Sequence, residues 1–168
     1  MSTFSHRFAL LILGLFAALT LGGCSSFDQQ WKSPQPLTSW QSGQPLPGRW
    51  EGQWMSDSGH SGKLRAIITP TQAPSSATGS VGESYVANFQ ATFLGVLKGD
   101  YSVDLVATPG ASTKFRGNKD LGWLAGGTYT YEGEASKGQF TARYSSPEDH
   151  GTFTMKRVGF DPFPSSNK

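Results

Sequence analysis

The side chains best suited to chemistry in this chain are two histidines that stand beside carboxylates in short polar segments. His60 closes the segment Asp57–His60, and His150 directly follows Asp149. Imidazoles and carboxylates can bind a divalent cation or can pair as general acid and base. The same residue types also build ordinary hairpin turns. We favour the structural role, place ligand binding second, and place metal binding or acid–base catalysis last.

The recognised catalytic motifs are missing from the sequence. The segment Gly59–Lys63 is similar to a phosphate-binding loop, but its first glycine is absent and Leu64 stands where Ser or Thr would bind magnesium. The chain also has no Gly-x-Ser-x-Gly elbow and no glycine-rich turn between a strand and a helix. We therefore expect a non-catalytic protein that needs no cofactor and no metal.

The elements that position these residues are predicted to be strands, because apolar residues recur at every second position. Trp50, Gly52 and Trp54 share one face of the first strand, and no stretch shows convincing helical periodicity. Eight strands joined by short turns favour an all-β, antiparallel up-and-down barrel, with a two-sheet β-sandwich as the alternative. The expected strands are residues 48–54, 62–69, 85–93, 101–107, 113–117, 128–132, 139–144 and 151–157.

Closing such a barrel pairs the last strand with the first. Placing Arg157 beside Trp50 brings Phe153 beside Trp54, and all the inward-facing positions then agree. Arg157 over the Trp50 ring would be a cation–π contact at this end of the barrel. The same register sets His150 beside Asp57 at the opposite end. We expect Trp50, Trp54, Phe153 and Arg157 to close the barrel structurally.

The first and last strands resemble those of lipocalins and their calycin relatives. The resemblance rests on Gly48 and Trp50 in the first strand and on the basic Arg157 in the last, and the C-terminal helix of lipocalins is missing. Residues 48–158 also resemble a group of uncharacterised small bacterial secreted domains, which implies no known activity. The residues of that fuller pattern are Gly48, Trp50, Gly52, Trp54, Gly126, Gly127, Tyr129, Tyr131, Gly133, Asp149, His150, Gly151, Phe153, Met155 and Arg157.

In an up-and-down barrel, the turns that follow odd-numbered strands lie together at one end, which we call the mouth. The mouth is where a small ligand could bind. Eight-stranded barrels are filled by side chains or hold one small ligand, and twelve inward rings favour a filled core over a cavity. The candidate mouth residues are Asp57, His60, Asp120, Trp123, Glu148, Asp149 and His150, with His60 and His150 as weak candidates for metal ligands.

The N-terminal segment predicts export and lipid attachment. An apolar run from Phe8 to Leu21 has the length of a signal-peptide core and is too short for a comfortable membrane span. It ends in Leu-Gly-Gly-Cys, which resembles the lipobox of bacterial lipoproteins and implies lipidation of Cys24, the single cysteine; an ordinary secretory signal is the alternative. In the diderm lipoproteins that this motif resembles, an Asp directly after the cysteine implies retention in the inner membrane. Ser25 and Ser26 stand there instead, which implies the outer membrane, facing the periplasm.

The predicted domains are a signal peptide (1–23), a spacer rich in Pro, Ser and Gln (24–46), the barrel (47–158) and an irregular tail (159–168). Four prolines between Pro34 and Pro47 favour extended chain in the spacer, where Trp31 and Trp40 could dock on the barrel or meet lipid headgroups. A second loose segment, residues 70–82, is expected to be a surface loop.

Charge and composition bound the function. The net charge is +2 without a long run of one sign, which excludes a clustered basic surface for nucleic acid. We expect a lipid-anchored β-barrel binding module of the cell envelope, which takes a small ligand at the mouth or an envelope protein as its partner. The alternatives are a structural or assembly lipoprotein without a ligand, and a metal-dependent or acid–base enzyme at the His60 and His150 mouth.

Overall fold

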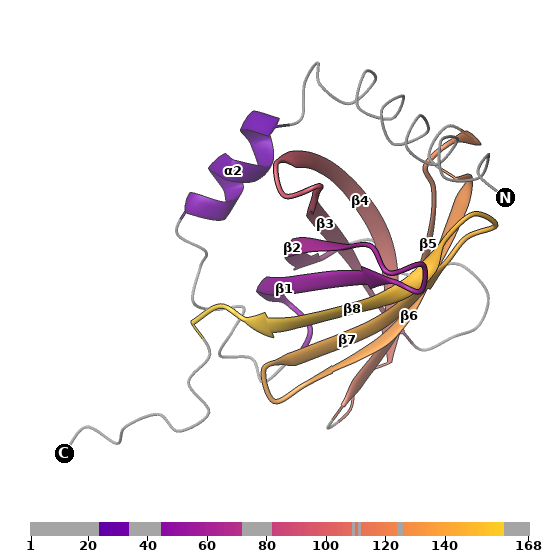
Figure 1. Ribbon diagram of the computed structural model, residues 1–168. Helices are drawn as coiled ribbons and strands as arrows, with labels where there is room; N and C mark the ends of the chain where they lie inside the picture. The colour runs from indigo at the N-terminus through magenta and orange to yellow at the C-terminus, as the bar shows by residue number, and fades with distance from the viewer. Residues whose placement is uncertain are drawn as a thin grey trace, which may run out of the picture.

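The computed structural model describes residues 24–33, 45–71, 82–108, 110, 112–123 and 126–159. They form a closed barrel of eight antiparallel strands, and each strand pairs with its neighbours in the chain (Figure 1). The predicted signal peptide, Trp40, most of the 70–82 loop and most of the tail lie outside these residues. The strands are β1 (Gly48–Ser56), β2 (Ser61–Pro70), β3 (Glu83–Phe93), β4 (Leu97–Thr108), β5 (Thr113–Asp120), β6 (Thr128–Ser136), β7 (Gln139–Ser145) and β8 (His150–Arg157).

The closure of the barrel has the predicted register. Trp50 pairs with Arg157 and Trp54 pairs with Phe153 across β1 and β8. Beyond the last pair, the Asp57 amide donates to the His150 carbonyl at 2.8 Å. The prediction of an eight-stranded antiparallel barrel is therefore confirmed, and the sandwich alternative is wrong because no sheet edge is left open.

Trp50 of β1 and Arg157 of β8 connect the first and last strands at the end of the barrel opposite the mouth. The Trp50 indole is fully buried, and its Nε1 donates to the Leu46 carbonyl at 3.0 Å. The Arg157 guanidinium lies 4.7 Å from the Trp50 ring centroid. Its Nη1 donates to the Pro47 carbonyl at 2.8 Å, and its Nη2 donates to the Pro45 carbonyl. This cation–π contact and these hydrogen bonds hold the chain that enters β1 against the end of β8.

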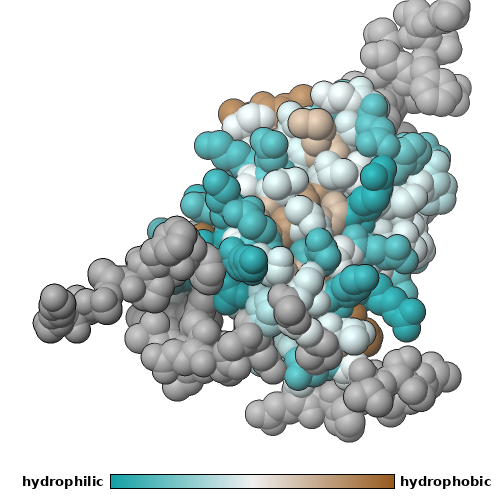
Figure 2. Space-filling model, turned by 90° about the horizontal axis from the view of Figure 1, so that it is seen from below, coloured by the Kyte–Doolittle hydropathy of each residue, from teal (hydrophilic) through white to brown (hydrophobic). Residues whose placement is uncertain are grey.

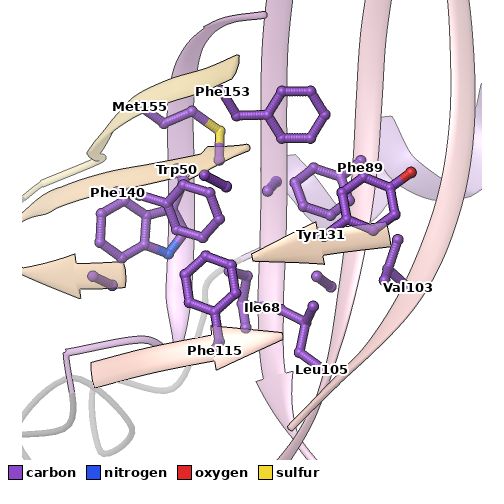
Figure 3. Close-up of a cluster of buried hydrophobic side chains, with 14 of the residues drawn as sticks. Trp50, Ile68, Phe89, Val103, Leu105, Phe115, Tyr131, Phe140, Phe153 and Met155 are labelled. Atoms are coloured by element: carbon purple, nitrogen blue, oxygen red, sulfur yellow. The ribbon is translucent and has the colours of Figure 1, made fainter. Parts of the chain in front are cut away.

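Aromatic side chains fill the inside of the barrel. Figure 3 shows Trp50, Phe115 and Phe140 pointing toward one another, with the Phe89 and Tyr131 rings beside them. The ring centroids of Phe115 and Phe140 are 4.7 Å apart, and those of Trp50 and Phe140 are 5.5 Å apart. These separations are those of packed aromatic pairs. The expectation of a filled core over a ligand cavity agrees with this packing.

Glycines allow the sheet to curve tightly around this core. A Cβ atom on Gly52 would lie 2.0 Å from the Thr154 carbonyl oxygen of β8, and one on Gly133 would lie 2.2 Å from the Thr141 carbonyl oxygen of β7. The same holds for Gly151 and the Met55 carbonyl oxygen, at 2.1 Å. Neighbouring strands approach so closely at these points that only glycine fits.

A helix, α2 (Cys24–Lys32), occupies part of the predicted extended spacer. That part of the prediction is wrong, because the prolines begin only at Pro34 and leave the preceding residues free to form a helix. Helix α2 packs on the outside of the barrel, where it contacts the start of β4 and reaches Arg49 of β1 and Arg65 of β2 (Figure 1). Among the described residues, no helix has the length and apolar character needed to cross a membrane.

Two aromatic residues and two arginines attach α2 to the barrel. Phe27 is only 4% exposed and stacks on Trp31 at 5.8 Å between ring centroids. The Arg65 guanidinium lies 5.0 Å from the Trp31 ring centroid, and Arg49 Nη1 donates to the Trp31 carbonyl at 2.7 Å. Trp31 therefore docks on the barrel wall. Ile67 is buried although it faces outward, which is consistent with cover by this helix.

Candidate functional site

The mouth contains a chain of hydrogen-bonded polar side chains centred on Asp149. Its Oδ1 accepts a hydrogen bond from Ser56 Oγ at 2.5 Å, and its Oδ2 accepts one from the Tyr144 hydroxyl at 3.0 Å. Ser56 Oγ also lies 2.7 Å from Ser58 Oγ, which in turn lies 2.9 Å from His60 Nδ1. This series of hydrogen bonds links the residue before β8 and the end of β7 to the turn between β1 and β2.

The order of the groups favours a structural role for this chain. In a Ser-His-Asp triad the imidazole stands between the carboxylate and the nucleophile, whereas here two serines separate Asp149 from His60. Ser56 Oγ also accepts the backbone N–H of Ser58 at 3.1 Å. In the facing turn, Ser146 Oγ accepts the N–H groups of Glu148 and Asp149 at 3.2 and 3.0 Å. These are the bonds that fix two hairpin turns.

The other predicted mouth residues do not join this chain. Asp120 Oδ1 accepts the Gly122 N–H at 2.8 Å and so stabilises its own turn, and Trp123 is 81% exposed. The exposed Asp57 and His150 meet through their backbones. Within the part of the chain that the structure describes, no three His, Cys, Asp or Glu side chains gather to hold a metal ion. The weak metal hypothesis for His60 and His150 gains no support from this geometry.

Sequence reasoning missed Ser56 and Tyr144 as partners of Asp149. Ser56 continues the inward alternation of Trp50 and Trp54, and it is buried beside the mouth. Tyr144 is the last inward residue of β7, where its hydroxyl reaches Asp149. The period of two along each strand could have identified both residues, because an inward polar group near a barrel end needs a hydrogen-bond partner.

Tyrosines continue the polar region into the core. The ring centroids of Tyr129 and Tyr144 are 6.1 Å apart, and those of Tyr129 and Tyr131 are 6.4 Å apart. Burial raises the pKa of Tyr101, Tyr131 and Tyr144 well above the usual tyrosine value, and the charge of Asp149 raises the pKa of Tyr144 further. These hydroxyls stay neutral in the fold and can act as hydrogen-bond donors.

The stability of the barrel should fall as the pH rises above about 10. The unfolded chain then loses its tyrosine protons, while the folded barrel keeps them because the pKa values of Tyr101, Tyr131 and Tyr144 are raised. Each such tyrosine lowers the free energy of unfolding by about 1.4 kcal/mol per pH unit until its folded pKa is reached. Denaturant unfolding between pH 8 and 11, followed by tryptophan fluorescence, measures the slope.

In a Tyr144→Phe variant the free energy of unfolding should fall less steeply with pH, because one of the tyrosines with a raised pKa is removed. An equal slope in both proteins would contradict the protected state of this hydroxyl.

The outer wall carries a second candidate site. A hollow of about 510 Å³ lies on the outside of β1, β2 and β8. We call it the wall hollow. Gly52 and Gly62 belong to its lining and contribute backbone atoms alone. Its lining residues are Glu51, Gly52, Gln53, Ser61, Gly62, Lys63, Thr154, Met155 and Lys156. The signal in the sequence that could have indicated this hollow is Gly52, a glycine at an inward position of the first strand. The hollow itself depends on the curvature of the sheet.

Comparisons with protein-family models, with curated proteins and with solved structures gave no match to this chain. Function must therefore be argued from the barrel itself and from the groups on its surface.

Proposed function

We propose that the protein is a lipid-anchored, non-catalytic envelope protein whose barrel binds an envelope partner through the wall hollow. The observation that carries this proposal is the filled interior, because the core rings occupy the space that an internal ligand would need. Binding then falls to the outer surface. The closure of the barrel by Trp50 and Arg157 supports a relation to the calycins, in a version without an internal ligand.

The proposed anchor is a lipid on Cys24. The motif Leu-Gly-Gly-Cys and the preceding apolar run support it. Because α2 begins at Cys24 and docks on the barrel through Phe27 and Trp31, the lipid would hold the barrel close to the bilayer without a long flexible spacer. Ser25 and Ser26 favour the outer membrane, on its periplasmic side, in a diderm cell.

The wall hollow is an open depression and not an enclosed cavity, so it suits the surface of a partner protein better than a small molecule. Its volume lies within the range of ligand pockets, but such pockets are usually lined by aromatic and apolar side chains. Here the side chains are mainly polar or charged, with two lysines and one glutamate. Lys63 on β2 and Lys156 on β8 are exposed on the two strands that flank β1, and they favour a partner with an acidic contact surface.

The anchor is tested by changing Cys24→Ala in the full chain. We expect the variant to lose incorporation of labelled palmitate and to leave the membrane fraction, whereas the neighbouring Ser26→Ala variant should keep both. Palmitate incorporation that persists in Cys24→Ala would refute the proposed anchor.

Partner binding is tested by photocrosslinking in cells. A photoreactive amino acid at Gln53, in the wall hollow, should capture one defined envelope protein, and the same group at the exposed Arg116 of β5 should not. The Lys63→Glu and Lys156→Glu double variant should lose the adduct. Equal capture at both positions, or capture that survives the charge reversal, would favour a structural lipoprotein without a specific partner.

A further inference from the structure

The large hydrophobic side chains that are exposed on the described barrel gather at the mouth. Val96 is 79% exposed and Leu94 is 68% exposed in the turn between β3 and β4, and Trp123 lies in the next odd-strand turn, between β5 and β6. Met55, 49% exposed, lies near the end of β1. All of these segments lie at the same end because the strands run up and down. Figure 2, which views one face of the molecule, shows mostly polar residues with hydrophobic ones in small groups at the upper margin and near the centre.

The turn between β3 and β4 exposes its leucine at a conformational cost. Leu94 and Gly95 have φ values of 49° and 78°, and the Val96 N–H donates to the Phe93 carbonyl at 3.1 Å. Both central residues are thus in the left-handed region, where Asn-Gly or Asp-Gly is the preferred pair. A solvated turn would gain from asparagine in place of Leu94. A branched apolar residue held in this backbone conformation suggests a function for its side chain.

The proposed anchor lies on the same side of the mouth. Asp28, in the second turn of α2, forms an ion pair at 3.7 Å with Lys98, which directly follows the β3–β4 turn. Trp31, nearer the C-terminal end of α2, contacts Arg49 at the opposite end of β1. Helix α2 therefore runs away from the mouth, and its Cys24 end lies toward the β3–β4 turn, which carries Leu94 and Val96. The turn between β7 and β8 carries Glu148 and Asp149 instead of exposed large hydrophobics.

We propose that the β3–β4 turn inserts Leu94 and Val96 into the lipid bilayer, with Trp123 at the headgroup level beside it. The occupant is a lipid surface because the proposed lipid on Cys24 would enter the bilayer from the end of α2 that lies toward this turn. The acidic β7–β8 turn lies at the same end of the barrel but across the mouth, and we do not expect it to enter the bilayer. This inference rests on the proposed anchoring and adds an orientation of the barrel. The mouth faces the membrane, and the wall hollow on the side of the barrel stays accessible to a partner.

The test places a fluorophore at the turn in the full-length, processed protein. Cys24 is the only cysteine, and its thiol is consumed when it carries lipid, so Leu94→Cys supplies a single labelling site for an NBD dye. Lys137→Cys is the matched control, because Lys137 and Gly138 form the same kind of turn, with φ values of 46° and 74°, at the other end of the barrel. Both proteins are reconstituted in phosphatidylethanolamine and phosphatidylglycerol vesicles that contain nitroxide-labelled acyl chains.

We expect a blue-shifted emission and strong nitroxide quenching at position 94, and neither effect at position 137. Equal spectra at the two positions would overturn the insertion. A blue shift at position 94 without quenching would also overturn it, because the turn would then be covered by protein or by a second copy of the chain.

The anchor and the insertion are separated by repeating the labelling in a Cys24→Ser background. Mass spectrometry of the parent protein shows independently whether Cys24 carries lipid. When the Cys24→Ser protein is mixed with the same vesicles, quenching at position 94 supports the insertion even if the parent carries no lipid. Absence of quenching in both backgrounds overturns it. An added Val96→Ser change should reduce the quenching.

Discussion

Replacing Trp50 with alanine should lower the free energy of unfolding by about 3–5 kcal/mol. The indole is fully buried, packs against Phe140 and supports the Arg157 guanidinium. Its loss opens a cavity and leaves the Leu46 carbonyl without its donor. The loss also removes the cation–π partner of a partly desolvated charge, since burial already lowers the pKa of Arg157. Urea unfolding followed by circular dichroism measures the difference.

Trp123→Ala provides the control, because this ring is 81% exposed. We expect the free energy of unfolding of that variant in solution to change by less than about 0.5 kcal/mol. An unchanged unfolding midpoint for Trp50→Ala would contradict the closure of the barrel at this end.

Gly52→Ala should be destabilised by more than about 3 kcal/mol, although it adds only one methyl group. The new Cβ would lie 2.0 Å from the Thr154 carbonyl oxygen and 2.7 Å from the Met155 Cα. Both atoms belong to the backbone of β8 and cannot rotate away. Relief therefore requires β1 and β8 to separate, which breaks the hydrogen bonds that close the barrel. Thermal unfolding measures the loss.

Gly99→Ala is the matched control for this prediction. Its Cβ would lie 3.3 Å from Cε2 of Phe93, a side-chain atom that can shift, and no backbone atom is as near. We expect a change below about 1 kcal/mol. Equal stability losses for Gly52→Ala and Gly99→Ala would show that the close approach of β1 and β8 is not the cause.

The barrel and its register were predictable because alternation along strands constrains both. A shift by one residue would have turned Trp50 and Trp54 outward, so parity excluded such shifts. The cation–π pairing of Arg157 with Trp50 then indicated the register that the structure shows. Strand ends were less predictable. β4 begins at Leu97, ahead of the expected start at residue 101, because Leu97 still pairs with Phe93.

Helix α2 was not predictable because docking stabilises it more than its own sequence does. A nine-residue helix is marginal in water, and α2 has one basic residue in its last turn and no acidic residue in its first. Its stability comes from Phe27 against the wall and from Trp31 beneath Arg65. Arg49 and Arg65, which contact Trp31, occupy outward positions of β1 and β2, and the sequence pattern predicts such residues to be solvated charges.

The candidate sites were partly predictable. Asp149 and His60 were assigned to the mouth, and the structure joins them through serines that the sequence pattern left as turn residues. Asp120 and Trp123 stay apart from that chain because each belongs to its own turn. The wall hollow could not be predicted, since it arises where three strands curve around glycines that contribute no side chain.

The seam between β1 and β8 also determines the order in which the molecule can be assembled. Each of the other pairs joins consecutive strands, whereas Arg157 and Pro47 bond across 110 residues. Hairpins can form locally as the chain emerges, but joining the distant ends is slower and has a larger entropic cost. Until β8 arrives, both free edges of the sheet can pair with other chains. The interval before closure is therefore when the chain is most prone to aggregate.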